Sequence, residues 1–171
     1  MNTVFTIGYE GTDIDRFMAT LHAVRIAVLV DVRAIAISRK KGFSKTALKT
    51  RLNSEGIAYQ HMNELGDPKP GREAARAGRI DEFRRIYSEH LRGADAQASL
   101  RKLTELALER SVCLLCFERD PKHCHRSIVS DHLIPMGFKP LDLYGDLPRR
   151  YDDFSPIRAH SHSDQSLAAT E

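Results

Sequence analysis

The sequence predicts a single α/β domain in which helices sandwich a mostly parallel sheet of about five strands. Short apolar runs alternate along the chain with segments of helical periodicity, the order typical of such folds. Two of the runs, IAVLVDV at 26–32 and VCLLCF at 112–117, are almost continuously apolar, as strands buried on both faces of a parallel sheet are. At 171 residues, the chain has the length of one domain.

The expected elements follow one another in alternation. Apolar, β-branched runs indicate strands at 3–9, 26–32, 56–62, 112–117 and 140–145. Apolar residues three and four positions apart indicate helices that begin after Thr12 and Asp13, after Ser44, near Ile80, near Leu100 and near Asp120. Gly56 stops the second helix, and the last one ends before Pro135. These apolar stripes are expected to form the core.

Residues 1–146 are expected to form the α/β domain, and residues 147–171 a polar, mobile C-terminal extension. The extension contains PRRYDD and HSHSDQSLAATE, which lack both periodicity and apolar content. A segment of this composition adds little to a core.

The small, odd number of cysteines and the N-terminal sequence indicate a cytoplasmic protein. The net charge is +3, there are three cysteines, and the N-terminal MNTVFTIGYE contains no secretory apolar segment. The longest apolar runs are far shorter than the ~20 residues that span a bilayer. We therefore expect no membrane association, no disulfide framework and no cofactor, while the oligomeric state stays open.

Polar side chains follow four of the predicted strands. The first strand ends in GYEG at 8–11, the second in Asp31 and Arg33, the third in His61, and the fourth in Cys116 and Glu118. The carboxyl ends of parallel strands meet at one edge of a sheet, where ligands bind. Residues two apart share a face of a strand, but strand order decides which pairs lie together. We expect one cleft that gathers Glu10, Asp31, Arg33, Cys116, Glu118 and Arg126.

The segment CFERDPKHCHR at 116–126 allows three interpretations. Cys116, Cys124 and His125 could bind a metal with His61 or His123, but seven residues separate the cysteines, which is a poor zinc spacing. Cys113 and Arg119 formally match a C-x5-R phosphatase pattern, but the residues between them belong to a strand rather than a phosphate loop. The favoured interpretation places His125 and Arg126 in the first turn of a helix, where an anion would bind.

A basic run extends from Arg39 to Arg51 and contains six cations and no acidic residue. Such a run is either a solvated helix face or a contact surface for a polyanion. The sequence leaves both alternatives open.

Four segments resemble the domain of unknown function 488 family. They are GYEG at 8–11, DVRAIAISRKKGFS at 31–44, LNSEGIAYQHMNELGDP at 52–68 and CFERDPKHCHR at 116–126, and the resemblance covers about residues 3–145. Ile35 or Ala36 stands near the place where that family often has a proline. The resemblance implies an α/β domain and no established activity. Its shared polar set is Asp31, Arg33, Arg39, Cys116, Glu118, Cys124, His125 and Arg126.

The sequence therefore favours an enzyme that acts on a phosphate-bearing ligand, a nucleotide or nucleic acid, at the strand C-terminal ends. Glu118 or Glu10 would be the general acid or base, His125 would transfer protons, and Cys116 could be a nucleophile. The alternatives are a non-catalytic nucleic-acid binding module and a thiol or metal protein. The expected ligand-binding residues are Tyr9, Asp31, Arg33, Arg39, Cys124 and Arg126.

Overall fold

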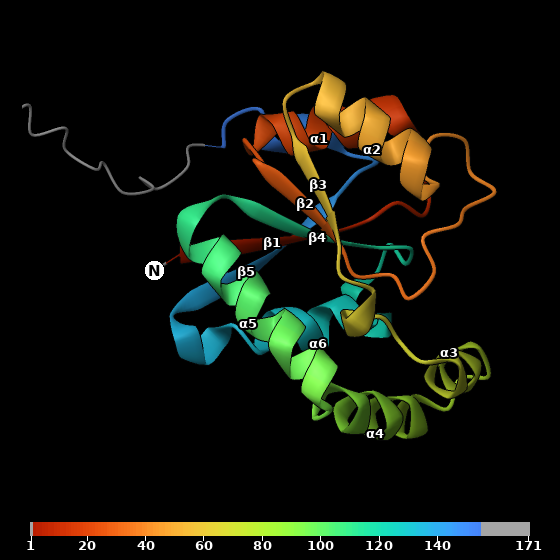
Figure 1. Cartoon of the computed structure of the whole chain (residues 1–171). Helices are drawn as coiled ribbons and strands as arrows, with labels where there is room; N and C mark the ends of the chain where they lie inside the picture. The colour runs from red at the N-terminus through yellow and green to blue at the C-terminus, as the bar shows by residue number, and fades with distance from the viewer. Residues whose placement is uncertain (1, 155–171) are drawn as a thin grey trace, which may run out of the picture.

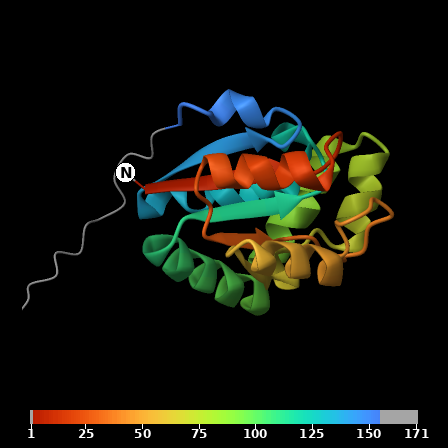
Figure 2. The same cartoon turned by 90° about the horizontal axis from the view of Figure 1, so that it is seen from above.

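Five parallel strands form one sheet, as the sequence predicts. The computed structural model describes residues 2–154. The strands are β1 (Asn2–Gly8), β2 (Val28–Asp31), β3 (Ala58–His61), β4 (Val112–Cys116) and β5 (Phe138–Tyr144). Their order across the sheet is β3-β2-β4-β1-β5, and all neighbours are parallel. The strand arrows accordingly point toward one edge (Figure 2).

Helices cover both faces of this sheet (Figure 1). They are α1 (Ile14–Ala23), α2 (Lys45–Ser54), α3 (Lys69–Arg76), α4 (Ile80–Leu91), α5 (Ala94–Glu109) and α6 (His125–Asp131). The chain moves across the sheet in one direction from β1 to β3 and in the other direction from β3 to β5. Because crossovers are right-handed, α1 and α2 lie on one face and the later helices on the other.

Two apolar cores result from this arrangement. Phe17, Leu21 and Leu48 of α1 and α2 pack on one face of the sheet, and Tyr87 and Leu103 of α4 and α5 pack on the other. The strands contribute alternate residues to each core, so every strand residue is assigned to a face by its position.

Helix starts agree with the sequence only in part. Asp13 caps α1 by accepting a hydrogen bond from the Arg16 amide, as expected. Ser44 precedes α2 but bonds to Ser38 instead. The helix α3 was not expected, because the residues that it buries are a glycine and an alanine rather than an apolar stripe.

The helix expected from Asp120 is divided. Asp120 caps a short 3₁₀ turn at Pro121–His123, and α6 begins only at His125. Cys124 interrupts them because its backbone is extended, with φ −133° and ψ 143°.

The start of the expected C-terminal extension packs on the domain. Tyr151 is buried in the core beside α1 and accepts a hydrogen bond from the Tyr144 amide. Phe154 packs edge-on against Phe5, with ring centroids 5.8 Å apart. The remainder of the extension, residues 155–171, lies outside the described residues, and so does its expected mobility.

Within residues 2–154, no helix combines the length and the apolar character needed to cross a membrane.

Gly8 allows two loops to meet at the end of β1. A Cβ atom at this position would lie 1.8 Å from the Glu118 carbonyl oxygen. The loop after β4 can therefore cross β1 only because residue 8 has no side chain.

We expect Gly8→Ala to lower the free energy of unfolding by at least about 3 kcal/mol, because the backbone of the β4 loop must move. Denaturant unfolding measures this. Gly78→Ala is the control: its φ is +73°, but nothing lies within 4 Å of the added Cβ. It should cost about 1 to 2 kcal/mol from backbone strain alone. Equal losses in the two variants would contradict the close approach at Gly8.

Candidate functional site

The structure divides the predicted site residues between the two faces of the sheet. Asp31 is the register partner of Leu115, which belongs to the core beside α1 and α2. Cys116 is the next residue of β4, so its side chain lies on the α6 face. The single cleft expected from the sequence is therefore replaced by two separate groups at the same sheet edge.

The first group is a buried ion-pair network around Arg33. Its Nε and Nη2 atoms donate to the two carboxylate oxygens of Asp31, at 2.8 and 2.6 Å. Nη1 donates to the Tyr9 hydroxyl and to the Phe43 carbonyl. Tyr59 donates its hydroxyl hydrogen to Asp31 at 2.6 Å. Arg33 is thus occupied by the protein and ties β1, β2 and the loop before α2 together.

Burial and charge set the ionisation of this network. Burial disfavours the Arg33 cation, but the adjacent Asp31 outweighs it and raises the pKa of Arg33. Burial, with the Asp31 carboxylate, also raises the pKa of Tyr59. The expected ligand-binding role of Tyr9, Asp31 and Arg33 gains no support, since their polar groups face one another.

The second group is the thiol–imidazole cluster, formed by Cys116, Cys124 and His125. The Nδ1 atom of His125 lies 3.7 Å from Cys116 Sγ and 4.0 Å from Cys124 Sγ. The three potential ligand atoms all lie within 4.8 Å of one another, and all three side chains are buried. On the other side of the ring, Nε2 donates to the Val32 carbonyl at 2.7 Å. The ring therefore presents Nδ1 to both sulfurs.

Protons are distributed unequally within the cluster. Burial opposes the Cys124 thiolate, but Cys116, His125 and Arg126 outweigh it and hold the pKa of Cys124 well below its usual range. Burial and the neighbouring Cys124 raise the pKa of Cys116. Burial would lower the pKa of His125, but the Cys124 thiolate raises it to about 9.

Two carboxyl groups accompany the cluster. Cys116 Sγ donates to Glu118 Oε2 at 3.1 Å, and burial raises the pKa of the partly exposed Glu118 to about 7. Burial also raises the pKa of Asp67 to about 6, a carboxyl that interacts electrostatically with His125 and Cys124. The Oδ1 atom of Asp67 is buried without a hydrogen-bond partner among the described residues.

Sequence reasoning missed Asp67 and also Tyr87, whose ring packs edge-on against His125 with centroids 5.3 Å apart. Asp67 lies within the NELGDP segment that resembles the family, which was the available signal. Tyr87 belongs to an apolar helical stripe and could be identified only as a core residue.

The side chain of Arg126 is fully buried, at 0% exposure, and most of its hydrogen bonds go to backbone carbonyls. Its guanidinium donates to Thr6 Oγ1 at 3.2 Å and to the carbonyls of Glu118 and Arg119 at 2.5 and 3.1 Å. The backbone amide of Arg126 donates to Cys124 Sγ at 3.5 Å. An anion at this helix start would have to displace these contacts, so the favoured sequence interpretation gains no support.

The remaining predicted residues have partners outside the cluster or are exposed. Glu10 accepts a hydrogen bond from the Arg119 amide at 2.9 Å, and Arg39 is exposed on the loop after β2. His61 is bonded to the Arg33 carbonyl, and exposed His123 lies 3.6 Å from Asp120. These two histidines therefore have other partners than the cluster.

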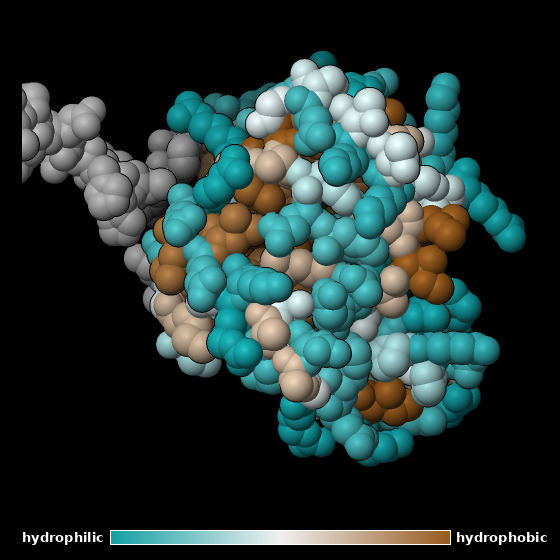
Figure 3. Space-filling view, viewed as in Figure 1, coloured by the Kyte–Doolittle hydropathy of each residue, from teal (hydrophilic) through white to brown (hydrophobic). Residues whose placement is uncertain are grey.

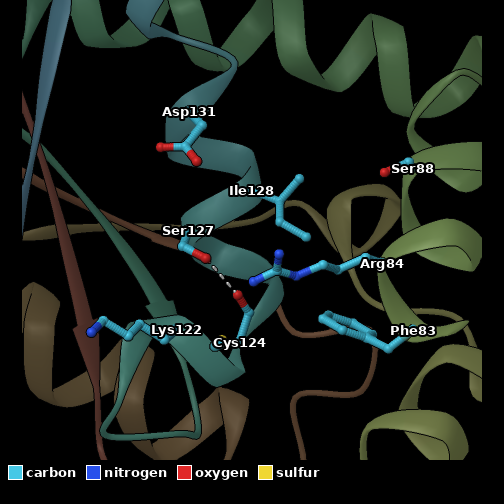
Figure 4. A pocket seen from close by; sticks show the side chains of 8 residues that line it. All are labelled: Phe83, Arg84, Ser88, Lys122, Cys124, Ser127, Ile128 and Asp131. Carbon is cyan, nitrogen blue, oxygen red and sulfur yellow. Dashed lines mark hydrogen bonds between the residues drawn. The ribbon is translucent and has the colours of Figure 1, made fainter. Parts of the chain in front are cut away.

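A cavity of about 250 Å³ lies between α4 and α6 (Figure 4). Cys124 forms part of its wall, and Arg84 reaches from α4 toward Ser127. The Ser127 hydroxyl donates to the Cys124 carbonyl at 2.9 Å. The cavity therefore approaches the cluster from the side of α6.

We expect Asp31→Asn to lower the free energy of unfolding by about 3 to 5 kcal/mol, because it leaves the Arg33 cation buried without a counter-charge. Urea unfolding measures the loss. The control Glu73→Gln removes one partner of the exposed Lys69–Glu73 pair and should change stability by less than about 0.5 kcal/mol. A loss at Asp31 as small as that of the control would show that Arg33 finds solvent or another partner.

Comparisons with known proteins identify a family. The family described as Domain of unknown function DUF488 matches residues 13–133. No curated protein and no solved structure matches the chain. The matched segment extends from the cap of α1 beyond the end of α6 and contains the whole thiol–imidazole cluster. Because the match covers more than half of the chain, the protein belongs to the DUF488 family.

Proposed function

We propose that the protein is an enzyme that acts on a phosphate-bearing ligand, a nucleotide or a nucleic acid, at the C-terminal edge of the sheet. The observation that carries this proposal is a cationic surface beside a reactive carboxyl group. Arg39, Lys41 and Lys45 are exposed on and next to the loop at 34–44, here called the basic loop. Cations held in this way attract phosphates.

The basic loop adjoins the loops that follow β1 and β4. Lys40 Nζ donates to the Tyr9 carbonyl at 3.3 Å. The next residue, Glu10, donates its amide hydrogen to the Phe117 carbonyl at 2.9 Å. The basic loop therefore contacts the β1 loop, which in turn contacts the residue before Glu118.

Exposed apolar side chains accompany these cations. Ile37 is 78% exposed and Ile35 58%, and Phe117 is 44% exposed while its ring packs edge-on against Tyr9. In Figure 3, brown side chains project at the right, where Figure 1 shows the orange loop after β2. Nucleic acids use both kinds of contact, because phosphates bind cations and bases stack on aromatic or apolar groups.

Glu118 is the proposed general acid or base. It is partly exposed, directly follows the exposed Phe117, and contacts the Cys116 thiol. A carboxyl in this position can reach a ligand held on the loops and exchange protons with it. Glu10 is less suited, since its carboxylate already accepts the Arg119 amide hydrogen.

We expect the combined replacement of Arg39, Lys40, Lys41 and Lys45 by glutamine to weaken binding of unrelated single-stranded oligonucleotides alike. The logarithmic salt dependence should flatten by roughly 0.7 for each phosphate that the replaced cations had neutralised. Fluorescence polarisation over a salt series measures both effects. The control replaces exposed cations elsewhere, Arg92, Arg101, Lys102 and Lys139, by glutamine. Equal weakening in both variants would show that the effect comes from net charge alone. Unchanged binding at low salt would show that the basic run is a solvated surface.

The same assay separates an enzyme from a binding module. Glu118→Gln should keep oligonucleotide or nucleotide affinity within about threefold and lower turnover by at least about a hundredfold, the usual range for a general acid or base. Mass spectrometry of a panel of nucleotides and oligonucleotides incubated with the wild-type protein reports turnover. Binding without any conversion across this panel would favour the non-catalytic nucleic-acid binding module.

A further inference from the structure

We propose that Cys116, Cys124 and His125 bind one zinc ion. The inference is independent of the ligand proposed above, because it concerns the buried side chains behind the loops rather than the exposed cations. It assigns the two cysteines and the histidine as metal ligands, and it leaves Glu118 as the group that faces the solvent.

The ligand atoms are already spaced for a tetrahedral ion. With zinc–sulfur bonds of about 2.3 Å and zinc–nitrogen bonds of about 2.0 Å, a sulfur and a nitrogen ligand lie about 3.6 Å apart. His125 Nδ1 lies 3.7 Å from Cys116 Sγ and 4.0 Å from Cys124 Sγ. These distances exceed the tetrahedral value by about 0.1 and 0.4 Å, and all three ligand atoms lie within 4.8 Å of one another.

The surroundings orient the three ligands. The bond from His125 Nε2 to the Val32 carbonyl fixes the hydrogen on the outer nitrogen and directs Nδ1 to the sulfurs, the usual support for a metal-binding histidine. Cys116 ends a buried strand, and the Arg126 amide holds Cys124. The ligands thus belong to rigid parts of the fold.

The fold explains how ligands with an unusual sequence spacing come together. The 3₁₀ turn at Pro121–His123 reverses the chain, and the Arg126 guanidinium holds the carbonyls of Glu118 and Arg119. The seven residues between Cys116 and Cys124 therefore form a closed loop that returns the second sulfur to the first.

The donor types select the metal. Two thiols and one imidazole are soft ligands that suit zinc rather than magnesium or calcium. The nearest carboxyl to the two thiols is that of Glu118, whose Oε2 atom lies 3.1 Å from Cys116 Sγ. Catalytic zinc sites have three protein ligands and keep the fourth position for water or substrate. Cys124 also lines the cavity between α4 and α6.

The experiment titrates the reduced, metal-free full-length protein with Zn²⁺ in competition with a chromogenic chelator, and with Co²⁺ followed by absorption. We expect one ion per chain and cobalt spectra with thiolate charge-transfer and tetrahedral bands. Cys116→Ser, Cys124→Ser and His125→Gln should each weaken zinc binding by at least about a hundredfold, more than the loss of a supporting group. Glu118→Gln should weaken it by about tenfold or less.

Cys113→Ser is the matched control, because Cys113 is a buried cysteine of the same strand on the opposite face. It should keep one zinc ion at wild-type affinity, and circular dichroism establishes that each variant is folded. No zinc bound by wild-type protein, or equal weakening by Cys113→Ser, would overturn the assignment. So would air oxidation of two thiols, with a mass decrease of two hydrogens, at the same rate with and without added zinc, since a bound ion protects its thiolate ligands from oxidation. Oligonucleotide binding is measured with the same metal-free protein. Zinc binding can then fail while oligonucleotide binding is kept, or the reverse, so the two proposals are tested separately.

Discussion

The buried guanidinium of Arg126 is the interaction on which the C-terminal edge of the sheet depends. It joins α6 to β1 through Thr6 and fixes the chain after β4 through two carbonyls. Thr6 in turn donates to Asp142 of β5 at 2.6 Å. Hydrogen bonds from a charged donor contribute about 1.5 to 3 kcal/mol each, and unpaired buried carbonyls would add a penalty. The positions of Glu118 and of the neighbouring His125 both follow from this one side chain.

The Arg33 network and the thiol–imidazole cluster are both bonded to residues at the end of β2. Asp31 and Arg33 face one side of the sheet, while the carbonyl of Val32 between them accepts the hydrogen bond from His125 on the other side. The Arg33 guanidinium also donates to the carbonyl of Phe43, near the end of the basic loop. Both groups are therefore attached to the same three consecutive residues of the chain, Asp31, Val32 and Arg33.

The sequence predicts the layers of this fold better than its site. Continuous apolar runs suffice to find buried parallel strands, but α3 buries only small residues and leaves no stripe. The two-residue period of a strand predicts that Asp31 and Arg33 share one face, and that Cys116 and Glu118 share one face. The sequence does not show that these are opposite faces of the sheet. That follows only from the register, in which Asp31 lies beside Leu115. The spacing of the cysteines argues against a shared site until the turn at Pro121–His123 is known. An arginine at a helix start looks the same in sequence whether it faces an anion or two carbonyls.

The position of β4 between β1 and β2 has a consequence for how the chain folds during synthesis. Before residue 112 is available, β1 has neither of its neighbours, and among the strands that the structure describes only β2 and β3 can pair. The sheet is completed by contacts between residues more than a hundred positions apart, such as Phe5 with Cys113 and with Leu141. Such non-local pairing is slow, because the entropy of closing the long loop is lost before the contacts form. The apolar part of the first strand, VFTIG, therefore leaves the ribosome unpaired and stays so until nearly the whole domain has been made.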